Sequence, residues 1–260
     1  MEPNKFIAEV YRRLDMENPI YVDSIDPDFF ISNEFVKNDI KNYQKVLPQN
    51  KDKKILDIGF GFGNFSAACI HLGYENIYCA DFGAKHKLLK ACKKFPQIKG
   101  VYDIESTVGD FLGDSDEKFD FIHLSHVIEH ISKHSLLYFV DSVYKSLNKD
   151  GIVLARTPNM LGPIPLHGFF STLGHEYGFT ETNLASLLEI CGFEMIQVYK
   201  FETDQSLKQR SANILRKIFS LKENLKYRLF LGTYPQEIGN ELVLSGTKKN
   251  KPELFDEKFK

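Results

Sequence analysis

The sequence predicts an α/β fold: a doubly wound sheet of mostly parallel strands with helices on both faces. The first indication is the apolar run Ile55–Ile58, which passes directly into glycines at 59, 61 and 63. The second is that apolar, strand-like segments alternate with helix-like segments along the chain, which is typical of parallel sheets connected by helices. With 260 residues, 43% hydrophobic and 26% charged, the chain has the composition of one large globular domain, or of one domain with additions.

The three glycines form the turn around which the rest of the fold is organised. Glycine adopts positive φ without strain and lets another molecule approach the backbone closely. A buried strand, a glycine turn and a helix, here expected from Phe65 to Leu72, begin the nucleotide site of a doubly wound fold. The spacing is G-x-G-x-G, not the G-x-G-x-x-G of the dinucleotide fingerprint, because Asn64 and Phe65 follow the last glycine.

The remaining elements follow in order along the chain. We expect further strands at 76–80, 106–108, 118–124, 152–155, 193–201 and 240–247, and helices at 84–95, 135–147 and 180–192. Thr180 and Gly192 are residue types that commonly begin and end a helix. The segment 160–178, rich in proline, glycine and aromatic residues, is long for a loop of a compact domain and is therefore a candidate functional loop.

Three segments lie outside this alternating pattern. Residues 1–50 predict a helical cap, with an amphipathic helix at 33–47, which either covers the ligand mouth or simply packs on the sheet. Residues 205–231 interleave basic and apolar side chains before the last strand. This insertion is either an ordinary helix with a solvated face or a surface for a membrane, a partner or a polyanionic substrate. The tail, 251–260, is charged, which leaves 51–250 as the main domain.

Charge and cysteine content exclude several classes of protein. A formal net charge of -2 gives no global basic field, so we expect no nucleic-acid partner. The cysteines at 69, 79, 92 and 191 form no C-x-x-C pair, which indicates structural thiols rather than a zinc site or a disulfide framework. No apolar run approaches the roughly 20 residues that cross a bilayer, and the polar N-terminus has no signal-peptide core, so we expect a cytoplasmic location.

Two acidic residues follow predicted strands and suit the adenosine part of a nucleotide. Asp81 ends the second strand about 20 residues after the glycine turn, where doubly wound folds place the carboxylate that binds the ribose hydroxyls. Asp110 and Phe111 come at the expected end of the third strand. There a carboxylate would accept from the amino group of an adenine and an aromatic ring would stack on it. The alternative role for Asp110 is a helix or turn cap.

Together these motifs resemble the class I S-adenosylmethionine-dependent methyltransferases over about 53–248. The matching segments are Leu56–Gly63, Asp81, Gly109–Phe111, Ser125–Ile131, His175–Thr180 and Cys191–Phe193. Within that family the chain looks most like the ubiquinone-biosynthesis-type O-methyltransferases and similar small-molecule and sugar methyltransferases. The resemblance implies a Rossmann-like, seven-stranded sheet whose last strand is antiparallel to the others. It also implies S-adenosylmethionine as the cofactor.

The resemblance further implies which residues surround the cofactor. The glycine turn passes under it, Asp81 binds its ribose, Asp110 lies near its adenine, and His126 lies beside its methionine part. Since this cofactor has no pyrophosphate, the turn needs close approach more than a phosphate cradle, which agrees with the altered glycine spacing. The full predicted set is Asp57, Gly59, Phe60, Gly61, Gly63, Asp81, Phe82, Asp110, Phe111, Ser125 and His126.

Histidines near the ends of the fourth and fifth strands are candidates for the chemistry. A hydroxyl acceptor must lose a proton during methyl transfer, and histidine suits this task near neutral pH. His175 is the first choice for base or substrate contact, because it matches a histidine in this loop of similar enzymes, and His130 with Glu129 is the second. The alternatives are a loop histidine bonded to the backbone for His175, and a cap of the next helix for the pair. His167 is the least constrained candidate.

The segment His126–His130 also matches H-x-x-E-H, a zinc pattern of metalloproteases. That pattern needs a helix to bring both histidines to one face, whereas this segment begins where a strand ends, so the protease interpretation is rejected. The ubiquinone-type relatives place an acidic residue and then Glu-His at this point. His126 in place of the acid disfavours a magnesium site made of oxygens. We therefore expect no resident metal, and a divalent cation at His126, Glu129 and His130 stays the alternative.

The sequence thus predicts O-methylation of a small polar acceptor with a histidine as general base. The acceptor would be a sugar, a nucleotide-linked intermediate or another metabolite, and the resemblance suggests surface-polysaccharide biosynthesis. An N-methyltransferase, a nicotinamide-dependent oxidoreductase and a non-catalytic cofactor-binding subunit remain alternatives, although the glycine spacing counts against the oxidoreductase. A homodimer is a candidate assembly. We expect the cap and the loop 160–178 to decide the acceptor.

Overall fold

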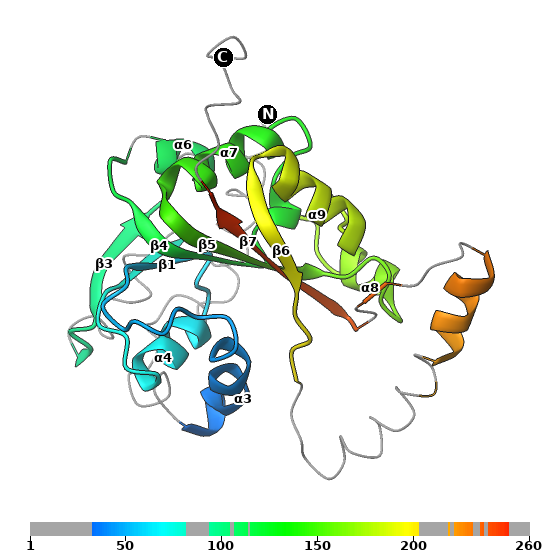
Figure 1. The fold of residues 1–260 in the computed structure, drawn as a ribbon, viewed down its shortest axis with the longest axis horizontal. Coiled ribbons are helices and arrows are strands. Elements are labelled where there is room, and N and C mark those ends of the chain that lie inside the picture. The colour runs from blue at the N-terminus through cyan, green and yellow to red at the C-terminus, as the bar shows by residue number, and fades with distance from the viewer. Residues whose placement is uncertain are drawn as a thin grey trace.

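The computed structural model describes residues 33–81, 94–104, 107–113, 115–202, 218, 221–230, 235–236 and 239–249. Seven strands form one sheet in the order β3-β2-β1-β4-β5-β7-β6 (Figure 1). They are β1 (Ile55–Ile58), β2 (Ile77–Asp81), β3 (Ile98–Asp103), β4 (Phe119–Ser125), β5 (Leu147–Pro158), β6 (Phe193–Val198) and β7 (Glu241–Lys248). The helices are α3 (Asn33–Tyr43), α4 (Asn64–His71), α6 (Val108–Gly113), η2 (Ile128–His130), α7 (Leu136–Ser146), α8 (Pro165–Phe170) and α9 (Glu181–Ile190).

The direction of the strands confirms the predicted fold class. The strands β3, β2, β1, β4 and β5 run parallel, and β7 is antiparallel to both β5 and β6. The chain order reverses at β1, which pairs with β2 on one side and with β4 on the other. Doubly wound folds bind ligands in the crevice outside the carboxyl ends of the strands at such a reversal. The ends of β1 and β4 are therefore where a site is expected.

Helices cover both faces of the sheet (Figure 1). On one face α3 and α4 pack over a buried cluster that includes Phe65 and Phe121. On the other face α6, α7 and α9 bury a second cluster that includes Ile122, Phe139 and Leu184. The neighbours Phe121 and Ile122 of β4 thus point into opposite helix layers, as the two-residue period of a strand requires. Burial on both faces explains why the central strands read as nearly continuous apolar runs.

The third strand is where the sequence prediction was wrong. The structure forms β3 at Ile98–Asp103, and the residues expected at a strand end form α6 instead. The Thr107 hydroxyl accepts a hydrogen bond from the backbone N of Asp110 at 3.0 Å, which is the interaction of a helix N-cap. Thr107 and Val108 are β-branched and for that reason resembled strand residues. Asp110 consequently lies in the first turn of a helix, not at a strand end.

The other boundaries differ in smaller ways. The predicted strands 76–80, 118–124 and 240–247 agree with β2, β4 and β7 to within one residue. β5 begins earlier than expected, because the residues before Ile152 are held inside the strand as a bulge with Asp150 at φ 61°. The segment 160–178 contains the short helix α8. α9 begins as predicted at Thr180, which forms a capping box with Asn183.

Part of the predicted cap is described by the structure. α3 ends at Tyr43 rather than at Leu47, and Val36, Tyr43 and Leu47 are all buried against the α4 side of the sheet. Residues 1–32 lie outside the described residues, as do nearly all of the helix expected at 84–95 and the tail after residue 249.

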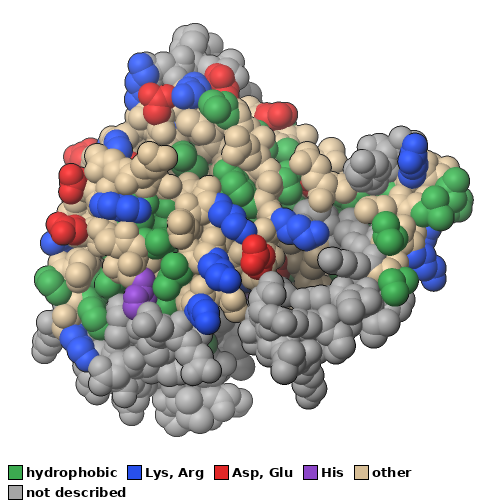
Figure 2. Space-filling view, turned by 60° about the horizontal axis from the view of Figure 1, so that its bottom comes forward, with side chains coloured by type: hydrophobic (Ala, Val, Ile, Leu, Met, Phe, Trp, Pro, Cys, Tyr) green, Lys and Arg blue, Asp and Glu red, His purple; other side chains and the backbone are tan. Residues whose placement is uncertain are grey.

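The basic insertion is described only in part, and residues 221–230 form a helix. This helix presents exposed apolar and basic side chains on a lobe beside the main body (Figure 2). Among the described residues, no helix is both long and apolar enough to span a bilayer.

Candidate active site

The glycine turn follows the carboxyl end of β1 and has a backbone that only glycine adopts without strain. Gly59, Gly61 and Gly63 have φ values of 69°, 51° and 77°. The backbone N of Gly61 donates to Asp81 Oδ2 at 3.1 Å, so the carboxylate at the end of β2 holds the turn. A Cβ added to Gly61 would meet no neighbouring atom closer than 4.0 Å. The turn thus offers open backbone next to a carboxylate, which suits close approach of a ribose.

Gly59 is the point at which the turn meets the segment after β4. A Cβ added to Gly59 would lie 2.4 Å from Val127 Cγ2 and 3.6 Å from the carbonyl O of Ser125. Only glycine therefore allows the two segments to pack this closely. The glycine turn and the start of the 125–131 segment form one continuous surface across the reversal between β1 and β4.

Asp57 lies beneath this surface. Its side chain is buried on the face that α4 covers, where it accepts hydrogen bonds from the Ser66 hydroxyl at 2.7 Å and from His123 Nδ1 at 2.9 Å. The carboxylate therefore anchors α4 and β4 below the glycine turn. Phe60 is likewise buried in the core, and Phe82 lies outside the described residues.

Asp110 and Phe111 lie on α6, just after the carboxyl end of β3. The Tyr138 hydroxyl donates to Asp110 Oδ1 at 3.1 Å. The Phe111 ring packs against Tyr102, with 5.5 Å between the ring centroids. Because β3 pairs with β2, these residues belong to the same edge of the sheet as Asp81.

A chain of hydrogen bonds runs from Asp57 to the end of β5. The Tyr43 hydroxyl donates to His123 Nε2 at 3.1 Å and accepts from Arg156 at 3.4 Å. The Arg156 guanidinium donates to Glu241 Oε2 through Nε at 3.1 Å and through a terminal nitrogen at 2.6 Å. Burial raises the pKa of the Tyr43 hydroxyl and outweighs the opposing effect of Arg156, so this hydroxyl stays protonated and donates.

The sequence prediction missed the members of this chain at Tyr43, His123, Arg156 and Glu241. The signal available for Arg156 and Glu241 was a charged residue at the end or start of an apolar strand. Since β7 runs against β5, the residue that opens β7 lies at the same edge as the residues that end β5, and Pro158 faces Glu241. Which residues pair depends on the register of β7, and the sequence alone does not specify that register.

His126 follows β4 in a left-handed conformation with φ of 55°, which is uncommon for a residue with a side chain. Its Nδ1 lies 3.0 Å from Glu129 Oε1 and its Nε2 lies 3.2 Å from Glu241 Oε1. Burial alone would lower the pKa of His126, but the hydrogen bonds to the two carboxylates outweigh it and raise the pKa to about 9. His126 is thus a cation that donates to a carboxylate on each side.

Glu129, His130 and His175 form a compact cluster of reactive side chains. One donor atom from each lies within 4.8 Å of the others. His130 Nδ1 lies 2.8 Å from the carbonyl O of Gly174, and His175 Nδ1 lies 2.8 Å from the carbonyl O of Phe169, so both nitrogens donate to backbone. His175 Nε2 is 3.9 Å from Glu129 Oε1. Burial lowers the pKa of His130. The structure thus brings together the three residues predicted to be catalytic.

Backbone contacts fix the His175 loop against η2. The backbone N atoms of Glu176 and Tyr177 both donate to the carbonyl O of Glu129, at 2.8 and 3.2 Å. A Cβ added to Gly174 would lie 2.8 Å from His130 Nδ1, so this position has no room for a side chain. His167, by contrast, is exposed on α8 and lies apart from these contacts.

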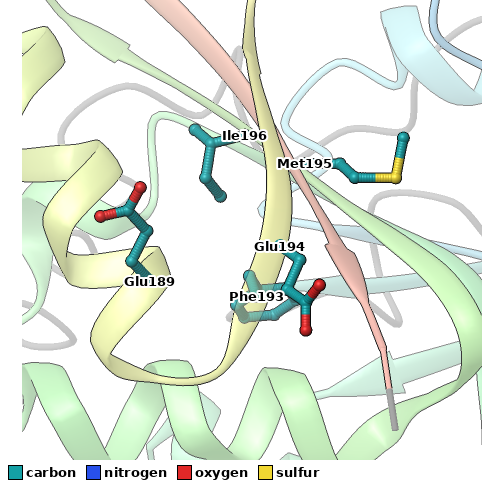
Figure 3. Close-up of a pocket in the computed structure, with 5 residues that line it drawn as sticks. All are labelled: Glu189, Phe193, Glu194, Met195 and Ile196. Carbon is teal, nitrogen blue, oxygen red and sulfur yellow. The ribbon is translucent and has the colours of Figure 1, made fainter. Parts of the chain in front are cut away.

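A separate shallow pocket of about 460 Å³ lies between α9 and β6 (Figure 3). Phe193 begins β6, which runs parallel to β5, so the pocket lies at the amino ends of the strands. Doubly wound folds bind ligands at the opposite edge, where the glycine turn and the histidine cluster are. The pocket is lined by Glu189, Phe193, Glu194, Met195 and Ile196.

Residues 33–198 match the family model described as a methyltransferase domain, which is more than half of the chain. The chain belongs to this family. The resemblance to the class I S-adenosylmethionine-dependent methyltransferases is therefore confirmed, and so is their sheet order with a reversed last strand. S-adenosylmethionine, the cofactor that the resemblance implies, is the cofactor of this family.

Solved structures agree with the family in fold. This methyltransferase is similar to a SAM-dependent methyltransferase from Archaeoglobus fulgidus, with a TM-score of 0.59 and 20% identity over 84% of this chain and 95% of that one. It is also similar to a methyltransferase from Thermotoga maritima described as a possible histamine N-methyltransferase. There the TM-score is 0.55 and the identity 14%, over 94% of this chain and 100% of that one. At these identities the likeness establishes the fold alone.

A curated relative matches over a shorter stretch. It is the ribosomal protein L11 methyltransferase of Staphylococcus saprophyticus, which is 33% identical over 97 residues. The match covers 37% of this methyltransferase and 29% of that protein's length.

Proposed function

We propose that this methyltransferase transfers the methyl group of S-adenosylmethionine to a hydroxyl group of a small polar acceptor. The observation that carries the proposal is the position of the Glu129–His130–His175 cluster. The segment that leads into η2 packs on the glycine turn through the contact of Gly59 with Val127. A cofactor bound over the turn would therefore lie beside groups able to accept a proton.

In this proposal the cofactor lies over Gly61, where the turn leaves open space. Asp81 accepts hydrogen bonds from the ribose hydroxyls, and its bond from the Gly61 backbone N orients the carboxylate beforehand. Asp110, oriented by the Tyr138 hydroxyl, lies on the adenine side. Asp57 supports the glycine turn from its buried side, since it anchors the helix that follows the turn.

The chemistry needs alignment and a proton acceptor. The acceptor oxygen forms a bond to the methyl carbon as the bond from that carbon to sulfur breaks, so orientation accounts for much of the rate. His175 is the proposed base, because its Nδ1 donates to the Phe169 carbonyl and its Nε2 therefore carries the lone pair. Glu129, with an oxygen 3.9 Å from that Nε2, would stabilise the imidazolium that forms. His130 is the second candidate by the same tautomer argument.

The proposed acceptor class is a sugar, a nucleotide-linked intermediate or a related metabolite, and surface-polysaccharide biosynthesis is the pathway suggested by the resemblance. Support for a hydroxyl acceptor comes from the cluster itself, because an amine acceptor needs less help from a base. The loop 160–178 supplies His175 and would form the acceptor side of the site. The similar Thermotoga maritima protein is described as a possible N-methyltransferase, so amines belong in any test.

The test is transfer of a labelled methyl group from S-adenosylmethionine to a panel of sugars, nucleotide sugars, phenols and amines. We expect label on a hydroxyl acceptor, and His175→Ala should lower turnover by roughly 10²- to 10⁴-fold while sparing S-adenosylhomocysteine binding. His134→Ala, a change at an exposed histidine, is the matched control and should retain full activity. Transfer to amines alone, or full activity of the His175 variant, would contradict the proposal.

A further inference from the structure

The cluster of Glu129, His130 and His175 has the composition of a metal site as well as of a proton acceptor. We propose that these three residues bind a divalent cation of the zinc, cobalt and iron class. Their donor atoms lie within 4.8 Å of one another before any ion is added, and they come from two segments tied together by backbone hydrogen bonds. The three ligands are therefore already gathered, and little chain ordering remains to oppose binding.

The Glu129 carboxylate supplies an independent observation. Its side chain is 1% exposed. Oε1 accepts from His126, whereas Oε2 is buried and has no hydrogen-bond partner among the described residues. Buried carboxylate oxygens are nearly always paired, because a buried charge without compensation is costly. A cation bound by Glu129 and the two imidazoles would compensate the charge of this buried carboxylate.

The histidines have the second contacts that metal ligands normally have. A ligating histidine usually donates its other ring N–H to a carbonyl or a carboxylate, which fixes the tautomer and the ring orientation. Here His130 Nδ1 and His175 Nδ1 each donate to a backbone carbonyl at 2.8 Å. Gly174, which accepts from His130, is also the residue whose lack of a side chain makes room for that ring. In both rings Nε2 is the nitrogen suited to ligation.

The ligand set selects the class of cation. Two imidazoles and one carboxylate suit zinc, cobalt and iron, whereas magnesium and calcium prefer oxygen ligands. The sequence disfavoured a magnesium site because His126 replaces the acidic residue that the ubiquinone-type relatives have at this point. In the structure both ring nitrogens of His126 bond to carboxylates, and the second imidazole comes from His175, far along the chain.

A role for the cation rests on the proposed function, whereas the binding itself does not. Three protein ligands leave positions open, and an acceptor hydroxyl bound there would have a lowered pKa. The hydroxyl proton would pass to solvent, the oxygen would form its bond to the methyl carbon, and the sulfur would leave with the electron pair as a neutral thioether. His175 would then bind the cation. The cation, and not His175 as a base, would promote loss of the proton from the acceptor hydroxyl.

The test uses the full chain, freed of metal by a chelator and dialysis and then titrated with Co²⁺. We expect visible absorption bands of four- or five-coordinate cobalt that saturate at about one ion per chain, and that Zn²⁺ but not Mg²⁺ displaces. His175→Ala and the nearly isosteric Glu129→Gln should weaken Co²⁺ binding by roughly 10- to 100-fold or more. His134→Ala controls for exposed histidines and should bind as the wild type does.

Thermal unfolding with and without Zn²⁺ guards against misfolded variants. The ion should raise the melting temperature of the wild type and of His134→Ala but not of a folded Glu129→Gln protein. Cobalt spectra that are unchanged by Glu129→Gln, or an absence of saturable binding, would overturn the proposal. If metal-free protein still methylates hydroxyls, the proposed function stands without the ion. If the ion binds and no hydroxyl is methylated, the site stands and the proposed function falls.

Discussion

Tyr43 donates a hydrogen bond of 3.1 Å to His123, from a helix that precedes the sheet into the middle of a central strand. Both side chains are almost fully buried, and their rings pack edge to face with centroids 5.1 Å apart. The same hydroxyl accepts from Arg156. α3 therefore packs into the core of the domain.

Tyr43→Phe should destabilise the protein. The change leaves His123 Nε2 and one Arg156 donor without the hydroxyl, and a buried group that loses its partner costs about 1–3 kcal/mol. Urea unfolding measures the difference. Tyr227→Phe changes a partly exposed tyrosine on the helix at 221–230 and should cost less than about 0.5 kcal/mol. Equal losses of unfolding free energy in the two variants would show that the buried hydrogen bonds of Tyr43 do not stabilise the protein.

Gly61→Ala should weaken cofactor binding more than it weakens the fold. Gly61 and Gly73 both have positive φ, and an added Cβ meets open space at either position. Alanine should therefore cost each variant roughly 1–2 kcal/mol of stability from backbone strain. Only Gly61 lies where the cofactor is proposed to pass. Calorimetry with S-adenosylhomocysteine should show lost affinity for Gly61→Ala and near wild-type affinity for Gly73→Ala. Equal affinities of the two variants for S-adenosylhomocysteine would contradict the proposal that the cofactor passes over the glycine turn.

Asp81→Ala should raise the dissociation constant of S-adenosylhomocysteine by roughly 10- to 100-fold, because hydrogen bonds to a carboxylate are worth about 1.5–3 kcal/mol. Asp81→Asn keeps an acceptor oxygen, so its dissociation constant should lie between those of Asp81→Ala and the wild type. Asp103→Ala is the control for charge alone, since Asp103 ends the neighbouring strand opposite Asp81. Unchanged affinity in Asp81→Ala would refute the ribose contact.

Gly174→Ala should lower turnover while leaving cofactor affinity unchanged. The new methyl group would press on His130 and shift its ring, and a displacement of about 1 Å in a catalytic group can cost roughly 100-fold in rate. Gly168→Ala, in the same loop, places its methyl group 3.6 Å from Pro158, an ordinary contact, and should be nearly silent. Steady-state kinetics of the two variants separate crowding of His130 from a general effect on the loop.

Asp120 should stabilise the fold at neutral pH but not in acid. Burial would raise its pKa, but hydrogen bonds from Lys53, the Lys54 backbone and Asn148 outweigh burial and lower it. A carboxyl with a depressed pKa contributes above its unfolded pKa of about 3.9 and loses that contribution as the pH falls toward the folded value. Wild type should exceed Asp120→Asn in urea stability at pH 7, and the difference should shrink at acid pH. A difference that persists in acid would contradict this.

Most of the fold could be predicted because its strands are buried on both faces and carry long apolar runs. β1 and β4 are examples, and the glycines between β1 and α4 mark the reversal of chain order. The third strand could not be predicted in the same way. Ile98–Asp103 lies at the edge of the sheet and is only partly buried, so its apolar pattern is weak. The β-branched residues that follow it instead serve to start α6.

The candidate site was predictable where it depends on a short motif and not where it depends on register. The glycine turn, Asp81 and the pair Glu129–His130 are each local in sequence. The contacts of Tyr43 with His123 and of Arg156 with Glu241 join residues 80 and 85 positions apart. Only the folded sheet specifies those pairings.

The strand order carries a consequence for the timing of folding during synthesis. β7 lies between β5 and β6, so β6 cannot hydrogen-bond to the sheet until the last strand has left the ribosome. Until then β5 has an unpaired edge, which is a template for pairing with other chains. Glu241, which bonds both Arg156 and His126, arrives with that same strand. Addition of β7 therefore has two effects in a single late step. It gives His126 its contact with Glu241, and it covers the edge of β5 through which the chain could aggregate.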